Sequence, residues 1–242
     1  MVQSNFIDLD EVQVDKPVYR VMPFDRLLQA LVSKELVLSK PMLWDDPFEN
    51  ALLRGTFPTG DGSRYSFAAK DYVYGQCWTL HRETDAMWRI YSHNKNGIRV
   101  TSTPRKLLDV LKVRGQQRWE KRCFIGRVKY QVKSELLKSI KKLSPLLSGG
   151  PAIAGSLLYK RTEFRHEREV RLIYCTEDVE HVGSVLPFAI DPTSLFDKIV
   201  FDPRADESVV KAQTKVLRAL GYAGRVTQST LYRIPQTPVV RR

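Results

Sequence analysis

Apolar residues in the first part of the chain have the spacing of one helix between two strands. Five of them recur at the intervals of an amphipathic helix: Phe24, Leu27, Leu28, Leu31 and Val32. The strand-like run PVYRVM (17–22) precedes this helix, and ELVLS (35–39) follows it. The pattern predicts a strand, a helix and a second strand at the start of the fold.

The rest of the chain continues this mixture without a strict alternation of strands and helices. Strands are predicted at VYGQCWTL (73–80), IRVTST (98–103), CFIGRVKYQV (123–132), EREVRLIY (167–174), SVLPFAI (184–190), FDKIVFD (196–202) and RVTQS (225–229). Helices are predicted after Thr84 or Asp85, after Pro104, over SELLKSIKKL (134–143) and over ESVVKAQTKVLRALGY (207–222). We therefore expect one α+β domain at 17–235, with a mixed or antiparallel sheet and flanking helices, between a polar leader (1–16) and a basic tail (236–242).

The positive charge of the chain is concentrated in one region. The net charge is +12, from 39 basic and 27 acidic residues, and residues 105–171 hold 18 basic and 6 acidic residues. The remaining residues therefore balance. A neutral scaffold with one cationic segment suits a polyanionic partner, RNA or DNA, with Lys138, Lys141 and Lys142 as candidate contacts, although a solvated helix face gives the same pattern.

Composition also bounds the location and the kind of site. No apolar run is long enough for a spanning helix or a secretory signal, so we expect a cytoplasmic protein without a membrane partner. Three cysteines and four scattered histidines lack metal-ligand spacing, and we therefore predict neither a metal site nor a disulfide.

Three motifs stand out: WDDPFE (44–49), CWTLHRETDAMWRIYS (77–92) with Gly97 after it, and YKRTEFRHEREVRLIY (159–174). In this order they resemble a bacterial family known only as a domain of unknown function, over roughly residues 18–201. Asp45 and Phe164 depart from its pattern, where asparagine and tryptophan are expected. The order of residue types also resembles the ADP-ribosyltransferase superfamily.

The superfamily resemblance implies an ADP-ribosyltransferase-like fold, NAD as the cofactor and a set of site residues. Arg20, or its neighbour Tyr19, would contact the phosphates of NAD. Tyr91, followed by Ser92, would stack on nicotinamide, with Trp88 completing an aromatic wall. A nucleic acid would be the acceptor. A role as a bacterial toxin or phage-defence effector, with an antitoxin or immunity partner, would follow.

Under this resemblance the two glutamates of EREVR have different tasks. On a strand, Glu167 and Glu169 lie on one face. Glu169 would stabilise the positive charge that develops on the ribose, and Glu167 would orient the acceptor or take its proton. The alternative for this pair is an ordinary ladder of charges with arginines and lysines on neighbouring strands.

Two other functions remain open at this point. One is a nucleic-acid-binding module without catalysis, in which Trp88, Tyr91 or Trp119 stacks on bases. The other is a metal-dependent nuclease that uses Asp45, Asp46 and Glu49. The same acidic loop would also serve simply to cap a helix beginning near Pro47.

Overall fold

The computed structural model describes residues 5–44, 46, 48–49, 53, 55–58, 63–66, 68–143, 149–176 and 183–234. The strands are β1 (Phe6–Ile7), β2 (Val18–Pro23), β3 (Glu35–Ser39), β4 (Thr56–Pro58), β5 (Arg64–Ser66), β6 (Val73–Thr79), β7 (Gly97–Ser102), β8 (Cys123–Arg127), β9 (Lys129–Gln131), β10 (Tyr159–Arg161), β11 (Glu169–Cys175), β12 (Val185–Ala189), β13 (Lys198–Phe201) and β14 (Arg225–Gln228). The α-helices are α1 (Phe24–Ser33), α3 (Asp85–Tyr91), α4 (Pro104–Gly115), α5 (Trp119–Arg122), α6 (Lys133–Leu143), α7 (Gly149–Ser156), α8 (Pro192–Leu195) and α9 (Glu207–Ala219).

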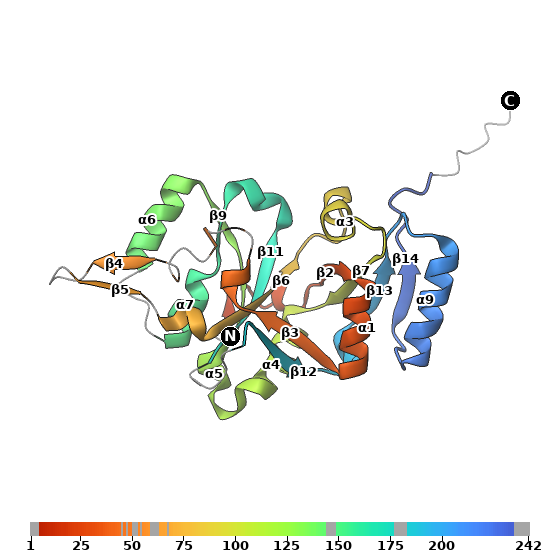
Figure 1. Cartoon of the computed structure of the whole chain (residues 1–242), viewed down its shortest axis with the longest axis horizontal. Coiled ribbons are helices and arrows are strands. Elements are labelled where there is room, and N and C mark those ends of the chain that lie inside the picture. The colour runs from red at the N-terminus through yellow and green to blue at the C-terminus, as the bar shows by residue number, and fades with distance from the viewer. Residues whose placement is uncertain are drawn as a thin grey trace.

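Ten of the strands form one mixed sheet. Its order is β1-β8-β11-β6-β2-β7-β13-β14, and β3 joins it through β6 and carries β12 (Figure 1). The pairs β1–β8 and β13–β14 are parallel, and the other neighbours in the sheet are antiparallel. The α+β class with a mixed sheet and flanking helices is therefore confirmed.

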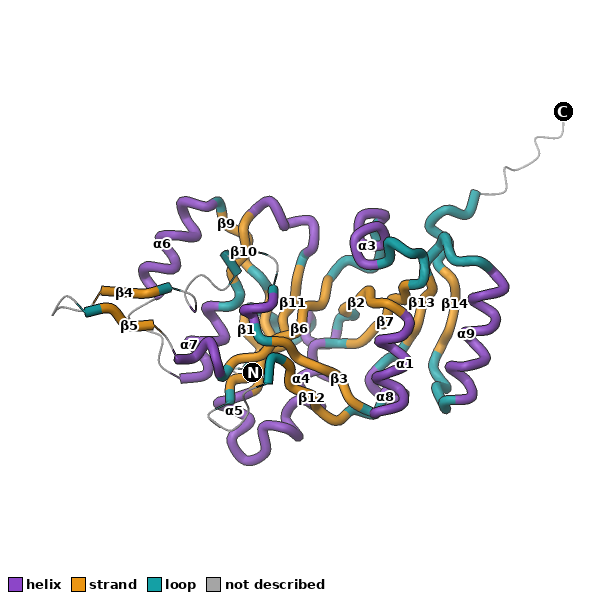
Figure 2. The backbone as a smooth tube through the Cα atoms, viewed as in Figure 1, coloured by secondary structure: helices purple, strands orange, loops and turns teal. Residues whose placement is uncertain are grey.

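The middle of the sheet is held by very little pairing. Strand β11 pairs with β6 over its whole length, but β2 pairs with β6 only at Tyr19 and Thr79. The two strands therefore part on one side of this contact. The sheet consequently has one half around β11 and another half around β7, as the tube in Figure 2 makes visible.

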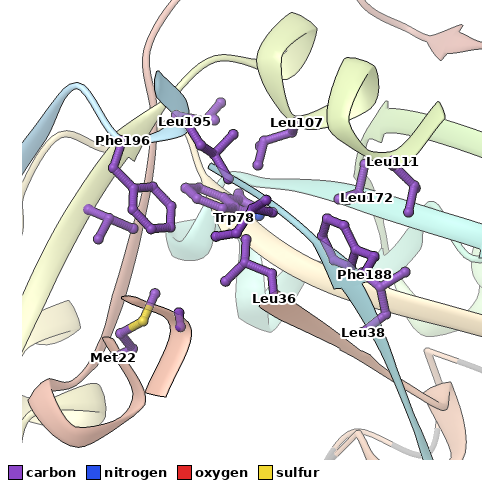
Figure 3. Packing of buried hydrophobic residues seen from close by; sticks show 14 of the residues in the cluster. Met22, Leu36, Leu38, Trp78, Leu107, Leu111, Leu172, Phe188, Leu195 and Phe196 are labelled. Carbon is purple, nitrogen blue, oxygen red and sulfur yellow. The ribbon is translucent and has the colours of Figure 1, made fainter. Parts of the chain in front are cut away.

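The main core lies on one face of both halves. It combines Trp78 of β6 with Leu36 and Leu38 of β3, Leu107 and Leu111 of α4, and Phe188 of β12 (Figure 3). Alternation along β11 sends Val170, Leu172 and Tyr174 into this core. It sends Glu169 and Arg171 to the opposite face, which therefore holds the charged residues of the strand.

A smaller cluster on that opposite face fixes helix α3. Met87 and Trp88 pack against Val21 of β2 and Val200 of β13. The hydroxyl of Thr84 caps the helix by accepting a hydrogen bond from the backbone nitrogen of Met87, at 3.1 Å. The position of this cap is as predicted, and it directs the last residue of the helix, Tyr91, over the charged face.

The start of the chain differs from a polar leader in the part that the structure describes. Phe6 and Ile7 form β1, which pairs in parallel with β8 at the edge of the sheet. Phe6, Leu9 and Val14 are buried in the main core. These apolar residues pack beside β8, whose edge offers unpaired hydrogen-bonding groups to β1. The local sequence pattern does not predict this pairing.

No helix among the described residues has the combination of length and apolar character that crossing a membrane requires.

Candidate active site

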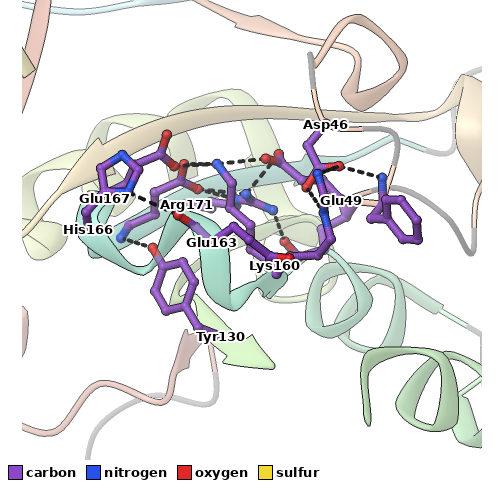
Figure 4. Close-up of polar contacts among 12 residues, drawn as sticks. Asp46, Glu49, Tyr130, Lys160, Glu163, His166, Glu167 and Arg171 are labelled. Carbon is purple, nitrogen blue, oxygen red and sulfur yellow. Dashed lines mark hydrogen bonds and ion pairs between the residues drawn. The ribbon is translucent and has the colours of Figure 1, made fainter. Parts of the chain in front are cut away.

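The two glutamates of EREVR come from different elements. Glu167 is the last residue of a 3-10 helix, η6 (Thr162–Glu167), and Glu169 is the first residue of β11. Arg168, between them, has a left-handed backbone with φ of 43°. The prediction that both lie on one strand was wrong. The left-handed residue turns the backbone so that both carboxylates still reach the same cation, and Figure 4 shows Glu167 and Lys160 in this group.

This cation is the ammonium group of Lys160 on β10. Lys160 Nζ lies 2.8 Å from Glu169 Oε1 and 2.8 Å from Glu49 Oε1, and it also pairs with Glu167 Oε2. All four side chains are buried, with Glu167 8% and Glu169 6% exposed. The glutamates therefore pair with a lysine of another strand, as the charge-ladder alternative expected, but they do so in a buried group of three carboxylates around one cation.

Arg171 is the second cation of this group. Its guanidinium contacts Glu169 Oε2 at 2.7 Å and Glu49 Oε2 at 2.9 Å, and it donates a hydrogen bond to the carbonyl of Leu157 at 2.6 Å. The side chain is fully buried. Two cations therefore face three carboxylates, and we call these five residues the ionic cluster: Glu49, Lys160, Glu167, Glu169 and Arg171.

The loop WDDPFE docks on the third motif, an association that sequence analysis missed. Besides Glu49, Asp46 pairs with Arg161 at 3.1 Å, and the rings of Trp44 and Phe48 lie 4.6 and 4.7 Å from the guanidinium groups of Arg171 and Arg161. The available signal was complementarity, since acidic and aromatic residues in one motif match basic residues in the other.

These ion pairs are relevant to two other interpretations of the acidic loop, as a metal-dependent nuclease site and as a helix cap. Asp46 and Glu49 already have arginine and lysine counter-ions. Within the described ranges, no group of three histidine, cysteine or acidic residues is arranged to hold a metal. Asp45 and Pro47 lie outside the described residues. Asp46 accepts a hydrogen bond from the backbone nitrogen of Phe48, so its side chain organises the loop locally.

The ionic cluster drives the pKa values of its two neighbouring glutamates apart. Burial and the adjacent Glu169 raise the pKa of Glu167. Burial also opposes ionisation of Glu169, but Arg171, Glu167 and Lys160 outweigh it and lower the pKa of Glu169. With three carboxylates for two cations, Glu167 is the carboxyl of this pair that takes up a proton more readily.

Tyr91 stands next to these charges. Its ring is 40% exposed at the end of α3. Burial, followed by the charges of Glu167 and Glu169, raises the pKa of its hydroxyl. Tyr91 therefore lies within electrostatic range of both glutamates, and the roles that the resemblance implies for these three residues stay predictions.

Arg20 lies where β2 and β6 part, one residue after the contact between Tyr19 and Thr79. Burial lowers its pKa, while the nearby Cys77 and Tyr91 raise it. Its guanidinium has no hydrogen bond or ion pair to any residue that the structure describes. Tyr19, in register with Thr79 and through it with Glu169, has the guanidinium of Arg99 5.1 Å from its ring centre.

Two other candidate residues, Trp88 and Ser92, are buried and make contacts within the fold. Trp88 is 1% exposed, packs in the small cluster under α3, and donates its indole hydrogen to Glu83 at 2.9 Å. Ser92 is buried, donates to Asp202 Oδ2 at 2.6 Å and accepts from the backbone nitrogen of Gly97. Neither side chain offers a free surface to a ligand. The aromatic wall was predicted from local apolar spacing and the position of these residues near a helix end, which do not reveal burial.

The lysines proposed for nucleic acid lie on α6, a helix that contacts β10. Lys138 is exposed there. Lys141 and Lys142 belong to the same helix, and their side chains lie outside the described part of the structure.

Comparisons with known proteins give distant likenesses. No protein-family model matches the chain, and no curated protein matches it. Solved structures of DarT from Thermus sp. 2.9 are similar to it at 14% identity: the complex with NAD+ (TM-score 0.41, covering 91% of this chain and 97% of that chain), the complex with ADP-ribosylated ssDNA (0.42, 92% and 96%) and the complex with carba-NAD+ (0.40, 89% and 96%). A likeness of this size assigns no activity, and what the chain does follows from its own side chains.

Proposed function

We propose that the chain is an NAD-dependent ADP-ribosyltransferase that modifies a nucleic acid. The observation that carries this proposal is the burial of two neighbouring carboxyls, Glu167 and Glu169, on one lysine, an arrangement that shifts their pKa values in opposite directions. Pairs of titratable groups whose environments separate their pKa values are typical of sites that divide two chemical tasks.

The residues near the cluster fit NAD. Arg20 has no counter-ion among the described residues, and a guanidinium offers paired hydrogen bonds to phosphate oxygens. The exposed ring of Tyr91 offers a face for stacking on nicotinamide. Both lie within electrostatic range of each other, since Tyr91 is among the groups that act on the pKa of Arg20, which burial lowers.

The two glutamates take complementary parts. When neutral nicotinamide leaves NAD, positive charge develops on the ribose. Glu169 stays ionised because its pKa is lowered, so a fixed negative charge faces that position. Glu167 holds a proton at lower pH and loses it near neutrality, so it can orient an acceptor group and then take its proton.

Lys160 and Arg171 act as positioning residues. Their positive charges hold the carboxylates in place through ion pairs. The rings of Phe164 and Trp44 lie 4.5 and 4.6 Å from these two cations. Such preorganisation spares the site reorganisation when charge develops.

In the same proposal, the chain acts as a bacterial toxin or phage-defence effector under the control of an antitoxin or immunity partner. The support is chemical: modification of nucleic acid damages the cell that carries it, so such an activity requires restraint.

Nicotinamide release from NAD by the purified chain tests the proposal. We expect turnover by the wild type and a fall of on the order of a hundredfold in Glu169→Gln, since removal of one electrostatic stabiliser costs about 3 kcal/mol in the transition state. Glu163→Gln is the matched control, because Glu163 is an exposed acid of η6 outside the ionic cluster.

Melting temperatures are measured in parallel. Wild-type protein without NAD turnover, tested alone and with RNA, DNA and protein acceptors, would reject the transferase. Salt-sensitive nucleic-acid binding by that inactive protein would then favour the module without catalysis.

A further inference from the structure

A hollow with arginines around it lies beyond the start of β11. Its volume is about 560 Å³, and four basic residues line it: Arg127, Lys129, Arg165 and Arg168. Asp8 and Tyr130 lie in the same lining. The hollow is therefore strongly cationic and belongs to neither the ionic cluster nor helix α6.

Most of its positive charge is uncompensated. Lys129 pairs with Asp8 at 2.7 Å. The exposed side chains of Arg127, Arg165 and Arg168 have no ion pair or hydrogen bond to any residue within the described ranges.

Tyr130 connects the hollow with the candidate active site. Its hydroxyl accepts a hydrogen bond from the backbone nitrogen of Glu169 at 2.8 Å. Burial raises its pKa to about 12, with contributions from the charges of Glu169 and Glu167. Arg168 stands between the two glutamates in the chain, so the cationic lining includes the segment that carries both carboxylates.

We propose that this hollow binds phosphates of the acceptor, a single-stranded nucleic acid, and brings a base of that strand to Glu167. The identity of the bound strand as acceptor rests on the proposed function; the phosphate site does not. Guanidinium groups bind phosphate oxygens in pairs, and three uncompensated arginines suit successive phosphates of a strand. A single strand is required because a base within a duplex is not accessible to side-chain chemistry.

The pyrophosphate of NAD is the other phosphate source to be distinguished. It carries two adjacent phosphates, and Arg20 is already available at the parting of β2 and β6. The hollow offers three arginines without a counter-ion among the described residues, which favours an extended strand over a second site for the same dinucleotide.

Fluorescence anisotropy with a labelled single-stranded oligonucleotide, without NAD, tests the site. The variant Arg127→Gln/Arg165→Gln should bind on the order of tenfold more weakly at moderate salt, and the slope of log K against log salt should fall by about 1.4, since each lost contact removes about 0.7 on a single strand. The control Arg26→Gln/Lys215→Gln removes two exposed charges from α1 and α9 and should change neither quantity.

Three outcomes would overturn the site: no oligonucleotide binding by the wild type, equal weakening in the control, or an affinity change for NAD in Arg127→Gln/Arg165→Gln without one for the oligonucleotide. The last would assign the hollow to the donor. Nicotinamide release by the wild type is measured separately. Its absence would reject the transferase and leave the phosphate site standing.

Discussion

Arg171 Nη2 lies 2.9 Å from Oε2 of Glu49, and this contact joins the loop WDDPFE to the central strand β11. Arg171 is fully buried and Glu49 is 6% exposed, so neither charge can turn to solvent if the other is removed. The loop is therefore part of the ionic cluster and determines how many carboxylates share its two cations.

Replacing Glu49 by glutamine should lower the free energy of unfolding by about 2–3 kcal/mol, because both buried cations lose one partner. The loss stays moderate since Glu167 can ionise in compensation. Asp15→Asn, which breaks an exposed and solvent-screened pair with Arg105, should cost much less. Urea titrations of both variants make the comparison, and equal costs would contradict a buried cluster.

Stability should depend on pH through Glu167. Its pKa rises from 4.5 to about 7 on folding, so the native chain holds a proton that the unfolded chain has lost between these values. The stabilisation is fully present below pH 4.5 and disappears as pH rises through 7. Glu169 has a lowered pKa, and its contribution is lost only as pH falls below the usual range.

Glu167→Gln removes the titrating group and isolates its effect. Between pH 5 and pH 8, the wild type should lose on the order of 1–3 kcal/mol relative to this variant. Unfolding free energies of both proteins at the two pH values provide the measurement. Parallel pH profiles would mean that Glu167 is ionised throughout and that the cluster stores no proton.

The left-handed backbone of Arg168 should restrict substitution at this position. Arg168→Asn should leave the melting temperature nearly unchanged, because asparagine tolerates positive φ, whereas Arg168→Val should cost about 1–2 kcal/mol. Arg225→Val, on the exposed edge of β14, is the control for a β-branched replacement of arginine and should be close to neutral. Similar stability of both Arg168 variants would show that the turn relaxes without cost.

Hydrolysis and transfer should respond differently to the two glutamates. Glu169→Gln should reduce both, since both require the fixed negative charge. Glu167→Gln should reduce transfer more than hydrolysis, because water needs less orientation than a nucleic-acid acceptor. Nicotinamide release and label incorporation into an oligonucleotide are compared for each variant. A constant ratio of the two rates would contradict separate tasks.

The sequence predicts the elements whose signals are local. Apolar spacing placed α1, α6 and α9, and Thr84 caps α3 as expected because a cap needs only the next three residues. Glu167 was placed on a strand because alternation over EREVR looks complete. Its actual position depends on the left-handed backbone of Arg168 and on Lys160, seven residues earlier, whose other partner Glu49 is distant in sequence; no periodicity encodes these contacts.

The candidate site was predicted in part for the same reason. Residue type and order brought Tyr91, Glu167 and Glu169 together, and the structure places them within electrostatic range. Trp88 was misjudged because an aromatic residue on an exposed helix and one in a small core have the same local spacing. Only the packing of Val21 and Val200 against it distinguishes them.

The unequal number of acids and bases in the ionic cluster has a consequence for ligand binding. A proton on Glu167 and a positive charge brought by a ligand are alternative ways to balance the third carboxylate. Arrival of a cationic group beside Glu167 should therefore expel the proton, and its departure should bring the proton back. Binding of a cationic ligand beside Glu167 and uptake of a hydrogen ion from the medium would then be mutually exclusive.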